Sequence, residues 1–263
     1  MFREQRVRLA LLSTFAALVL LLTSAGAAGA SARQSTTLSP AGAASVPATQ
    51  PSNPVINPAD FVDRIDNRYF PLKPGTTFIY KGTKGGLAQR DVITVTHATK
   101  RILGVSAVVV RDRVTEEGEL IELTFDWFAQ DKHGNVWYFG EDSKEYENGV
   151  VVSTEGSWEA GVNGAQPGIV MEGHPRVGDS YRQEFAPDVA EDMAKVLSLT
   201  KSVSVPYGSF KHVLLTKEWT PLDPGVVEHK YYAPDIGFVL AISASEQERL
   251  ELVNIKRGDE DGD

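Results

Sequence analysis

The chain has 263 residues and contains no cysteine. This absence excludes disulfide bonds, thiolate catalysis and cysteine-ligated zinc. The nucleotide-binding patterns GxxxxGK and GxGxxG, the zinc-protease pattern HExxH and the hydrolase pattern GxSxG are also missing. The sequence therefore predicts no cofactor, and it leaves the catalytic residues of any enzyme unassigned.

An excess of basic residues is also missing, because 26 Lys and Arg face 35 Asp and Glu, for a net charge of −9. Removal of residues 1–32 takes away three Arg and one Glu, which changes −9 to −11. Like charges repel, so this balance disfavours nucleic acid and anionic membrane surfaces as partners. We expect neither class of partner.

Long apolar runs are scarce, and the one that stands out is Leu9–Leu22, which follows three Arg in the first eight positions. At 14 residues it is shorter than the roughly 20 that a spanning helix needs. Residues 1–32 are therefore predicted to be a signal peptide, with an uncleaved anchor as the alternative. We expect an extracytoplasmic protein (secreted, periplasmic or cell-wall associated) with no stable membrane insertion after signal cleavage.

Residues 33–57 contain mostly Ser, Thr, Ala, Pro and Gln, which bury too little apolar surface to order a chain. They are predicted to form a disordered linker. The β domain is expected at 58–256, followed by an acidic tail at 257–263. Asn57 and Pro58 are typical of a helix start, and one or two helical turns are expected to run through Phe61–Val62.

From Gly75 onward, apolar and polar residues alternate between Gly, Asn, Asp and Pro breaks, which predicts antiparallel β-strands. Asn148–Gly149 suits a two-residue hairpin turn, and Gly134 suits a bulge in the turn after Asp131. A short helix is expected where Asp188 and Glu191 form a capping pair ahead of Met193, Val196 and Leu197.

An internal repeat organises this pattern. Val92–Thr96 matches Val196–Thr200, and Trp127–Asp131 matches Tyr231–Asp235, each at an offset of 104. Two repeats, about 72–140 and 175–243, are predicted, joined by an inserted hairpin segment. The alternative is that unrelated β-meanders share strand and turn patterns. The predicted fold is all-β: an antiparallel sandwich or barrel-like pair of duplicated β-meanders, with one or two short helices.

Four runs resemble a set of exported bacterial β-proteins that have no assigned activity. They are Asn67-Arg-Tyr-Phe-Pro-Leu, Pro74-Gly-Thr-Thr-Phe, Asp131-Lys-His-Gly-Asn-Val-Trp-Tyr-Phe-Gly-Glu and Lys230-Tyr-Tyr-Ala-Pro-Asp-Ile-Gly. The resemblance covers about residues 60–245. It implies an envelope location and a β fold, and it brings no catalytic residue with it.

The hairpin around Asp131 is expected to place Trp127 opposite Phe139 and Ala129 opposite Trp137. On its other face, Phe128 and Tyr138 would stack on a ligand while Asp126 and Gln130 hydrogen-bond it. The alternative is that both faces are ordinary core. The predicted ligand contacts, with Arg182 as the orienting charge, are Phe128, Tyr138, Trp158, Arg182, Trp219, Tyr231 and Tyr232.

The sequence predicts no metal site. His212 and His229 lie on neighbouring predicted strands, but at about 3.3 Å per residue they would be about 13 Å apart. The segment from Asp131 to Asn135 has a partial likeness to a calcium loop, but His133 stands where a ligand oxygen is needed. A plain hairpin turn is the preferred interpretation.

Taken together, these features predict an exported, non-enzymatic binding protein for a small amphiphile or a glycan-like ligand such as an oligosaccharide. One alternative is a glycan-active hydrolase or lyase that uses Glu184, Glu191 or His229. The same polar residues would otherwise be surface ion pairs and caps. A second alternative is a structural envelope protein.

Overall fold

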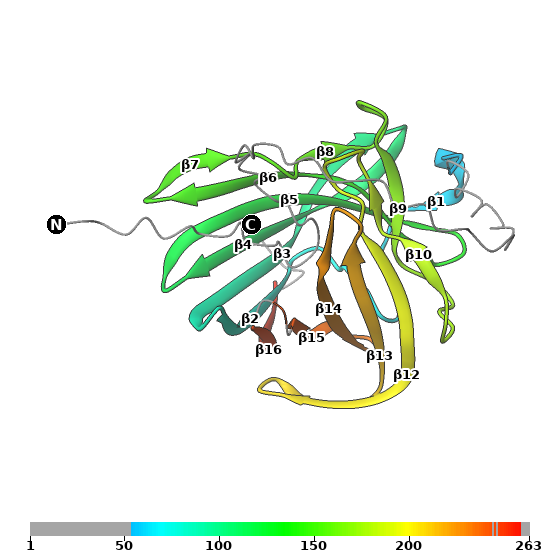
Figure 1. The fold of residues 1–263 in the computed structure, drawn as a ribbon. Coiled ribbons are helices and arrows are strands. Elements are labelled where there is room, and N and C mark those ends of the chain that lie inside the picture. The colour runs from blue at the N-terminus through cyan, green and yellow to red at the C-terminus, as the bar shows by residue number, and fades with distance from the viewer. Residues whose placement is uncertain (1–53, 244, 246, 259–263) are drawn as a thin grey trace, which may run out of the picture.

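The structure, a computed structural model, describes residues 54–243, 245 and 247–258. The predicted signal peptide, most of the predicted linker and most of the acidic tail lie outside these residues. The described chain is almost entirely β-strand (Figure 1). Within it, the one helical segment is the three-residue 3-10 helix η1 (Pro58–Asp60).

The strands follow one another in chain order. They are β1 (Phe61–Val62), β2 (Thr76–Lys84), β3 (Leu87–Ile102), β4 (Val105–Glu116), β5 (Glu119–Asp131), β6 (Val136–Glu147), β7 (Val150–Ser153), β8 (Trp158–Glu159), β9 (Gln166–Met171), β10 (Ser180–Arg182), β11 (Glu184–Phe185), β12 (Met193–Val205), β13 (Gly208–Thr220), β14 (Asp223–Ala233), β15 (Gly237–Ser243) and β16 (Glu248–Arg257).

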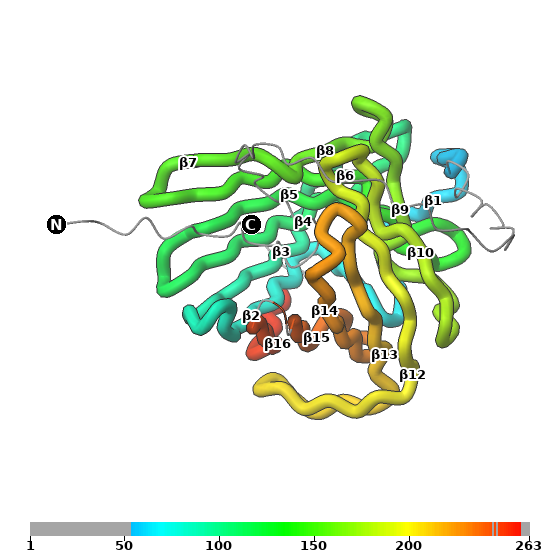
Figure 2. The backbone as a smooth tube through the Cα atoms, in the orientation of Figure 1, coloured from blue at the N-terminus to red at the C-terminus, as the bar shows by residue number. Residues whose placement is uncertain are grey.

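These strands form one antiparallel sheet whose two ends meet. Its order is β10-β12-β13-β14-β15-β16-β2-β3-β4-β5-β6-β9-β11. The end strands β10 and β11 are consecutive in the chain and are separated only by Gln183. β10 pairs with β12 and β11 pairs with β9, so one extended segment joins the two edges (Figure 2). The predicted all-β antiparallel fold is confirmed, in its barrel-like form.

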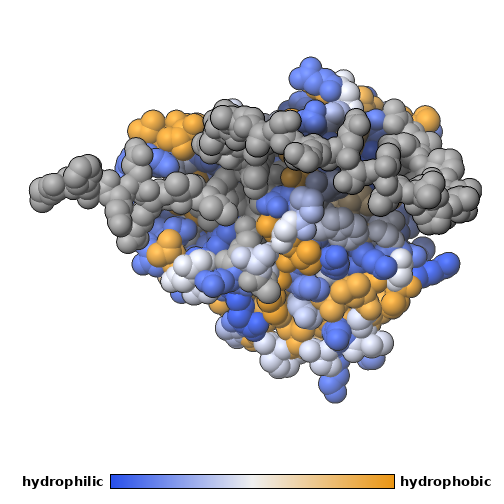
Figure 3. All heavy atoms as spheres, in the orientation of Figure 1, coloured by the Kyte–Doolittle hydropathy of each residue, from blue (hydrophilic) through white to orange (hydrophobic). Residues whose placement is uncertain are grey.

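Local turn chemistry explains the hairpins. Asn148 and Gly149 have φ of 51° and 77° and connect β6 to β7 through the pair Glu147–Val150, as predicted. Gly134, with φ of 83°, lies in the β5–β6 turn. The β6–β7 hairpin extends beyond the barrel, and Figure 3 shows the apolar side chains exposed over β7. These are Val150, Val151 and Val152.

The helix predictions need two corrections. Asn57 does cap η1 through its bond from the Ala59 amide, but the helix ends at Asp60 and Phe61–Val62 form β1 against β5. The prediction of a short helix after the Asp188–Glu191 capping pair, through Met193, Val196 and Leu197, is wrong, because these three residues belong to β12, which pairs with both β10 and β13.

The capping pattern itself is present, since the Asp188 amide donates to the Glu191 carboxylate at 3.2 Å. However, it stabilises a turn in which Asp188 has φ of 60°. Beyond it, Ala194 and Val196 are buried while Lys195 is exposed, which is strand periodicity.

The two predicted repeats correspond to two runs of five strands, β2–β6 and β10 with β12–β15. Trp127–Phe128 lies on β5 and Tyr231–Tyr232 on β14, the fourth strand of each run. The runs do not stack as a sandwich: β16 joins them edge to edge in the same sheet. The duplication of the chain stays a prediction.

The segment Ile65–Leu72 crosses one end of the barrel. Its Phe70 ring lies 5.5 Å from Phe128 of β5 and 6.3 Å from Tyr232 of β14, centroid to centroid. The Asn67 amide donates to the Gly134 carbonyl at 2.8 Å, in the β5–β6 turn. This segment therefore ties the two strand runs together and places aromatic side chains at this end of the interior.

Candidate functional site

Four of the seven predicted ligand residues lie buried inside the barrel, and three of them form one aromatic group. Phe128 and Tyr138 face each other across β5 and β6, with ring centroids 4.7 Å apart and planes at 18°. Trp158 of β8 meets Tyr138 edge to face at 5.4 Å. Tyr232, the fourth, is connected to this group through Phe70.

The remaining three predicted residues do not join this group. Trp219 and Tyr231 are the strand neighbours of the buried Glu218 and Tyr232, so strand alternation places them on the outer face. Arg182 donates to the Gln166 side chain at 2.8 Å. The predicted ligand residues therefore do not form a single surface.

The predicted hairpin register is confirmed near the turn and corrected beyond it. Ala129 pairs with Trp137 and Phe128 with Tyr138, but a bulge then places Asp126 opposite Glu141. The bulge centres on Gly140, whose φ is 127° and where an added Cβ would lie 2.2 Å from the Trp158 carbonyl oxygen. Close approach of β8 requires glycine there and brings Trp158 beside Glu141.

The Asp131 side chain in the β5–β6 turn forms its hydrogen bonds with neighbouring residues of the same hairpin. The Asp131 carboxylate accepts from the His133 and Asn135 amides and from the Trp137 indole at 2.8–3.0 Å. This is the hairpin turn that the sequence predicted rather than a calcium loop. The Gln130 side chain, expected to reach a ligand, instead accepts the amides of Asp66 and Asn67.

Beside the aromatic group, the inner wall of the barrel carries carboxylates. Tyr138 donates its hydroxyl to Asp126 at 2.7 Å, and the Trp158 indole donates to Glu184 at 2.8 Å. Glu141 lies between them, opposite Asp126 on β5 and Trp158 on β8. Asp126, Glu141 and Glu184 are exposed by only 0%, 2% and 1%. We call these three residues the interior acidic cluster.

The interior acidic cluster is short of hydrogen-bond donors. Both oxygens of Glu141 and Oδ2 of Asp126 are buried without a partner, whereas the Glu184 carboxyl is within hydrogen-bonding reach of the Asp192 carboxyl. Burial is the main cause that raises the pKa of all three carboxyls well above their usual range. Neighbouring carboxylates add to this: Asp112 raises the pKa of Asp126, and Asp192 that of Glu184.

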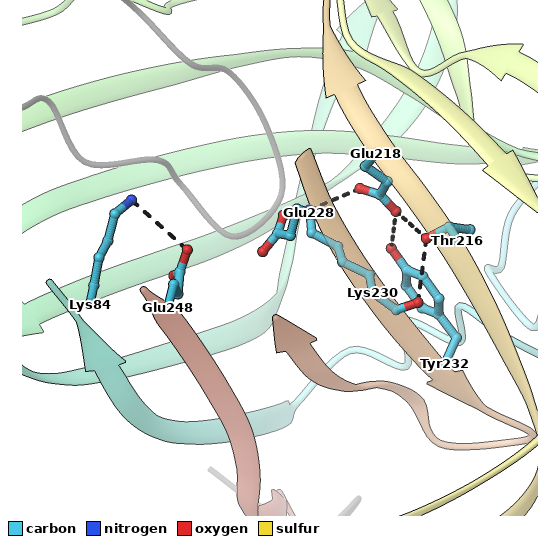
Figure 4. A network of polar contacts seen from close by, with 7 residues as sticks. All are labelled: Lys84, Thr216, Glu218, Glu228, Lys230, Tyr232 and Glu248. Atoms are coloured by element: carbon cyan, nitrogen blue, oxygen red, sulfur yellow. Dashed lines mark hydrogen bonds and ion pairs between the residues drawn. The ribbon is translucent and has the colours of Figure 1, made fainter. Parts of the chain in front are cut away.

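A second polar network lies in the same interior, but it contains a lysine (Figure 4). Lys230 of β14 contacts Glu218 at 3.0 Å and Glu228 at 3.1 Å. Glu218 also accepts the hydroxyls of Thr216 and Tyr232. Burial lowers the pKa of Lys230, but the two carboxylates reverse this and raise it above its ordinary value.

The residues of the enzyme alternative do not converge. Glu184 points to the interior, whereas His229 is the strand neighbour of the buried Lys230 and lies on the opposite face of β14. Glu191 accepts the Asp188 amide in the turn before β12. Across residues 54–243, 245 and 247–258, no three Asp, Glu or His side chains are grouped closely enough to hold a metal ion.

Comparison with known proteins adds one weak likeness. No protein-family model matches the sequence, and no curated protein matches it. A crystal structure described as a "putative lipoprotein" from Parabacteroides distasonis ATCC 8503 is similar at a TM-score of 0.36 and 13% identity. The match covers 72% of this chain and 99% of that chain. A likeness at this level defines neither fold nor function.

No helix in the part of the chain that the structure describes has the length and apolar character to cross a membrane.

Proposed function

We propose that this is an exported, non-enzymatic binding protein that holds an amphiphilic ligand inside its barrel. The single observation that carries the proposal is that buried polar atoms on the inner wall lack partners. Natural cores pair nearly all buried polar groups, because an unpaired one costs about 1–3 kcal/mol. An interior with such groups is suited to a ligand that supplies the missing partners.

The layout of the interior supports an amphiphile. Phe70, Phe128 and Tyr138 form an apolar, aromatic end. Asp126 and Glu141 begin directly beside it. Binding sites with this division combine an apolar wall with a few convergent polar groups. The export of the protein rests on the basic and apolar pattern of the first 32 residues.

Two matched tryptophan variants test where the ligand binds. Trp158 lines the interior, whereas Trp219 lies on the outer face near Lys217. With a panel of single-chain amphiphiles and oligosaccharides, we expect amphiphiles to raise the melting temperature of the wild type. We expect Trp158→Phe to reduce this shift, because it removes the donor to Glu184, and Trp219→Phe to preserve it.

The proposal is contradicted if no amphiphile raises the melting temperature. It is also contradicted if the shift is lost in Trp219→Phe but kept in Trp158→Phe. A response to oligosaccharides alone would favour the glycan-like ligand on the outer face instead.

A further inference from the structure

The interior acidic cluster has no cation of its own. In the part of the chain that the structure describes, no Lys or Arg forms an ion pair with Asp126, Glu141 or Glu184. The groups that reach it are the Tyr138 hydroxyl and the Trp158 indole, which are both neutral, and the Asp192 carboxyl beside Glu184, which adds no positive charge. The cluster therefore keeps its negative charge uncompensated, or it binds protons.

In the other strand run, the interior carboxylates have a lysine beside them. Lys230 on β14 lies between Glu218 and Glu228, at 3.0 and 3.1 Å, and offsets one of their two charges. At the predicted offset of 104 residues, the position of Lys230 corresponds to Asp126 on β5. Where one run places an ammonium group in the interior, the other places a further carboxylate. The interior acidic cluster therefore lacks a positively charged group of the kind that Lys230 supplies on β14.

The geometry favours an organic cation over a metal ion. The carboxylates are not grouped closely enough for one metal ion. Their unpaired oxygens, both from Glu141 and one from Asp126, suit a group with several N–H donors. The adjacent rings of Tyr138 and Trp158 place aromatic side chains directly beside these carboxylates.

We propose that the ligand is an amphiphilic organic cation whose guanidinium group is held by Asp126, Glu141 and Glu184. This inference rests on the proposed function. Its apolar body would lie along the aromatic end formed by Phe70 and Phe128. The bound group would donate to the oxygens that the chain leaves unpaired.

Titration calorimetry with three probes of equal chain length tests the charge preference: octylguanidinium, octanoate and octanol. We expect octylguanidinium to bind the wild type at least tenfold more tightly than the other two. Its binding should release protons, because a cation displaces them from buried carboxyls. The measured enthalpy should then differ between phosphate and Tris buffers, whose ionisation heats differ.

Two charge-matched variants locate the site. Glu141→Gln should weaken octylguanidinium at least tenfold, whereas Glu119→Gln, an exposed residue of the same strand β5 as Asp126, should leave it unchanged. The melting temperature of each variant shows that it is folded. Asp126→Asn, which removes the charge on the facing strand, provides a second interior variant should Glu141→Gln be unfolded.

Three results separate the two proposals. If octanol or octanoate binds as tightly as octylguanidinium, the cation inference is overturned and the proposed function stands. If octylguanidinium binds equally well to Glu141→Gln and Asp126→Asn, the assignment to the interior acidic cluster is overturned. If none of the three probes binds, the cation inference and the proposed function both fail.

Discussion

Glu141 places both oxygens of its carboxyl in the barrel interior without a hydrogen-bond partner. The neighbouring Tyr138 and Trp158 donate to Asp126 and Glu184 instead. An ionised carboxylate in such surroundings is costly, so protonation is favoured, which is why its pKa is raised. We therefore expect Glu141 to lower the stability of the free protein, and under the proposed function a bound ligand would offset this cost.

Replacement of Glu141 by Gln should therefore stabilise the free protein. The neutral amide removes the cost of holding a buried carboxyl that would be ionised in the unfolded chain at pH 8, and it can donate to Asp126, so we expect the free energy of unfolding at pH 8 to rise by about 1 kcal/mol. Urea unfolding followed by tryptophan fluorescence measures it. Glu119→Gln is the control and should change stability by less than about 0.5 kcal/mol. A less stable Glu141→Gln at pH 8 would show that the chain already compensates Glu141.

Lys230 is the opposite case, because two carboxylates depend on it. Lys230→Met leaves Glu218 and Glu228 buried without their cation, and we expect a loss of about 3–5 kcal/mol. Lys144→Met, at a partly exposed ion pair with Asp142, should cost less than about 1 kcal/mol. Denaturant unfolding at pH 7 compares the two variants, and equal losses would contradict the role of Lys230.

At the scale of elements, the closure of the sheet depends on the segment from β10 to β11. Gly168 of β9 lies against this segment: an added Cβ would be 2.3 Å from the Gln183 carbonyl oxygen. Only a residue without a side chain allows β9 to approach so closely. The barrel seam thus brings two backbones into close contact at Gly168, beside the β9–β11 pairing.

Gly168→Ala should force β9 and β11 apart. We expect a loss of about 1–3 kcal/mol, the usual cost of overpacking, and faster hydrogen exchange in residues 180–185. Gly208→Ala is the matched control, since its Cβ would find only ordinary contacts at 3.6 Å. If exchange accelerates equally in both variants, the seam does not depend on Gly168.

Some elements could be predicted from local chemistry and others could not. Asn148–Gly149 needs positive φ at both positions, a requirement visible in the sequence. The Asp188–Glu191 pair was misleading because the same hydrogen bond stabilises a turn and a helix start. The residues after this pair form a strand because β12 pairs with β10 and β13. Such pairing depends on distant parts of the chain and cannot be seen in the local sequence.

At the scale of the whole molecule, barrel closure determines which strand face becomes the interior. Glu122, Thr124 and Asp126 alternate along β5, a polar pattern that usually marks a solvent-exposed face. Closure turns this face inward, where all three are buried. Phe128 and Tyr138 were predicted correctly to share a face with Asp126. Glu141 could not be predicted, because the bulge at Gly140 changes its register.

The raised pKa values predict how stability depends on pH. In the folded state, Glu122, Asp126, Glu141 and Glu184 retain protons that the unfolded chain releases above about pH 4.3. Because the folded state then binds more protons, stability should fall as pH rises from about 5 to 8. Urea unfolding at several pH values measures this slope. The triple variant Asp126→Asn, Glu141→Gln, Glu184→Gln should flatten it, and a wild-type stability that rises over this range would contradict the pKa shifts.

Native mass spectrometry of the protein purified from its own host tests most directly whether the barrel interior holds a ligand. We expect the wild type to have an additional small-molecule mass, and the triple variant, prepared in the same way, to show the mass of the chain alone. A wild type that shows only the chain mass, under conditions that preserve other non-covalent complexes, would contradict a ligand site in the barrel.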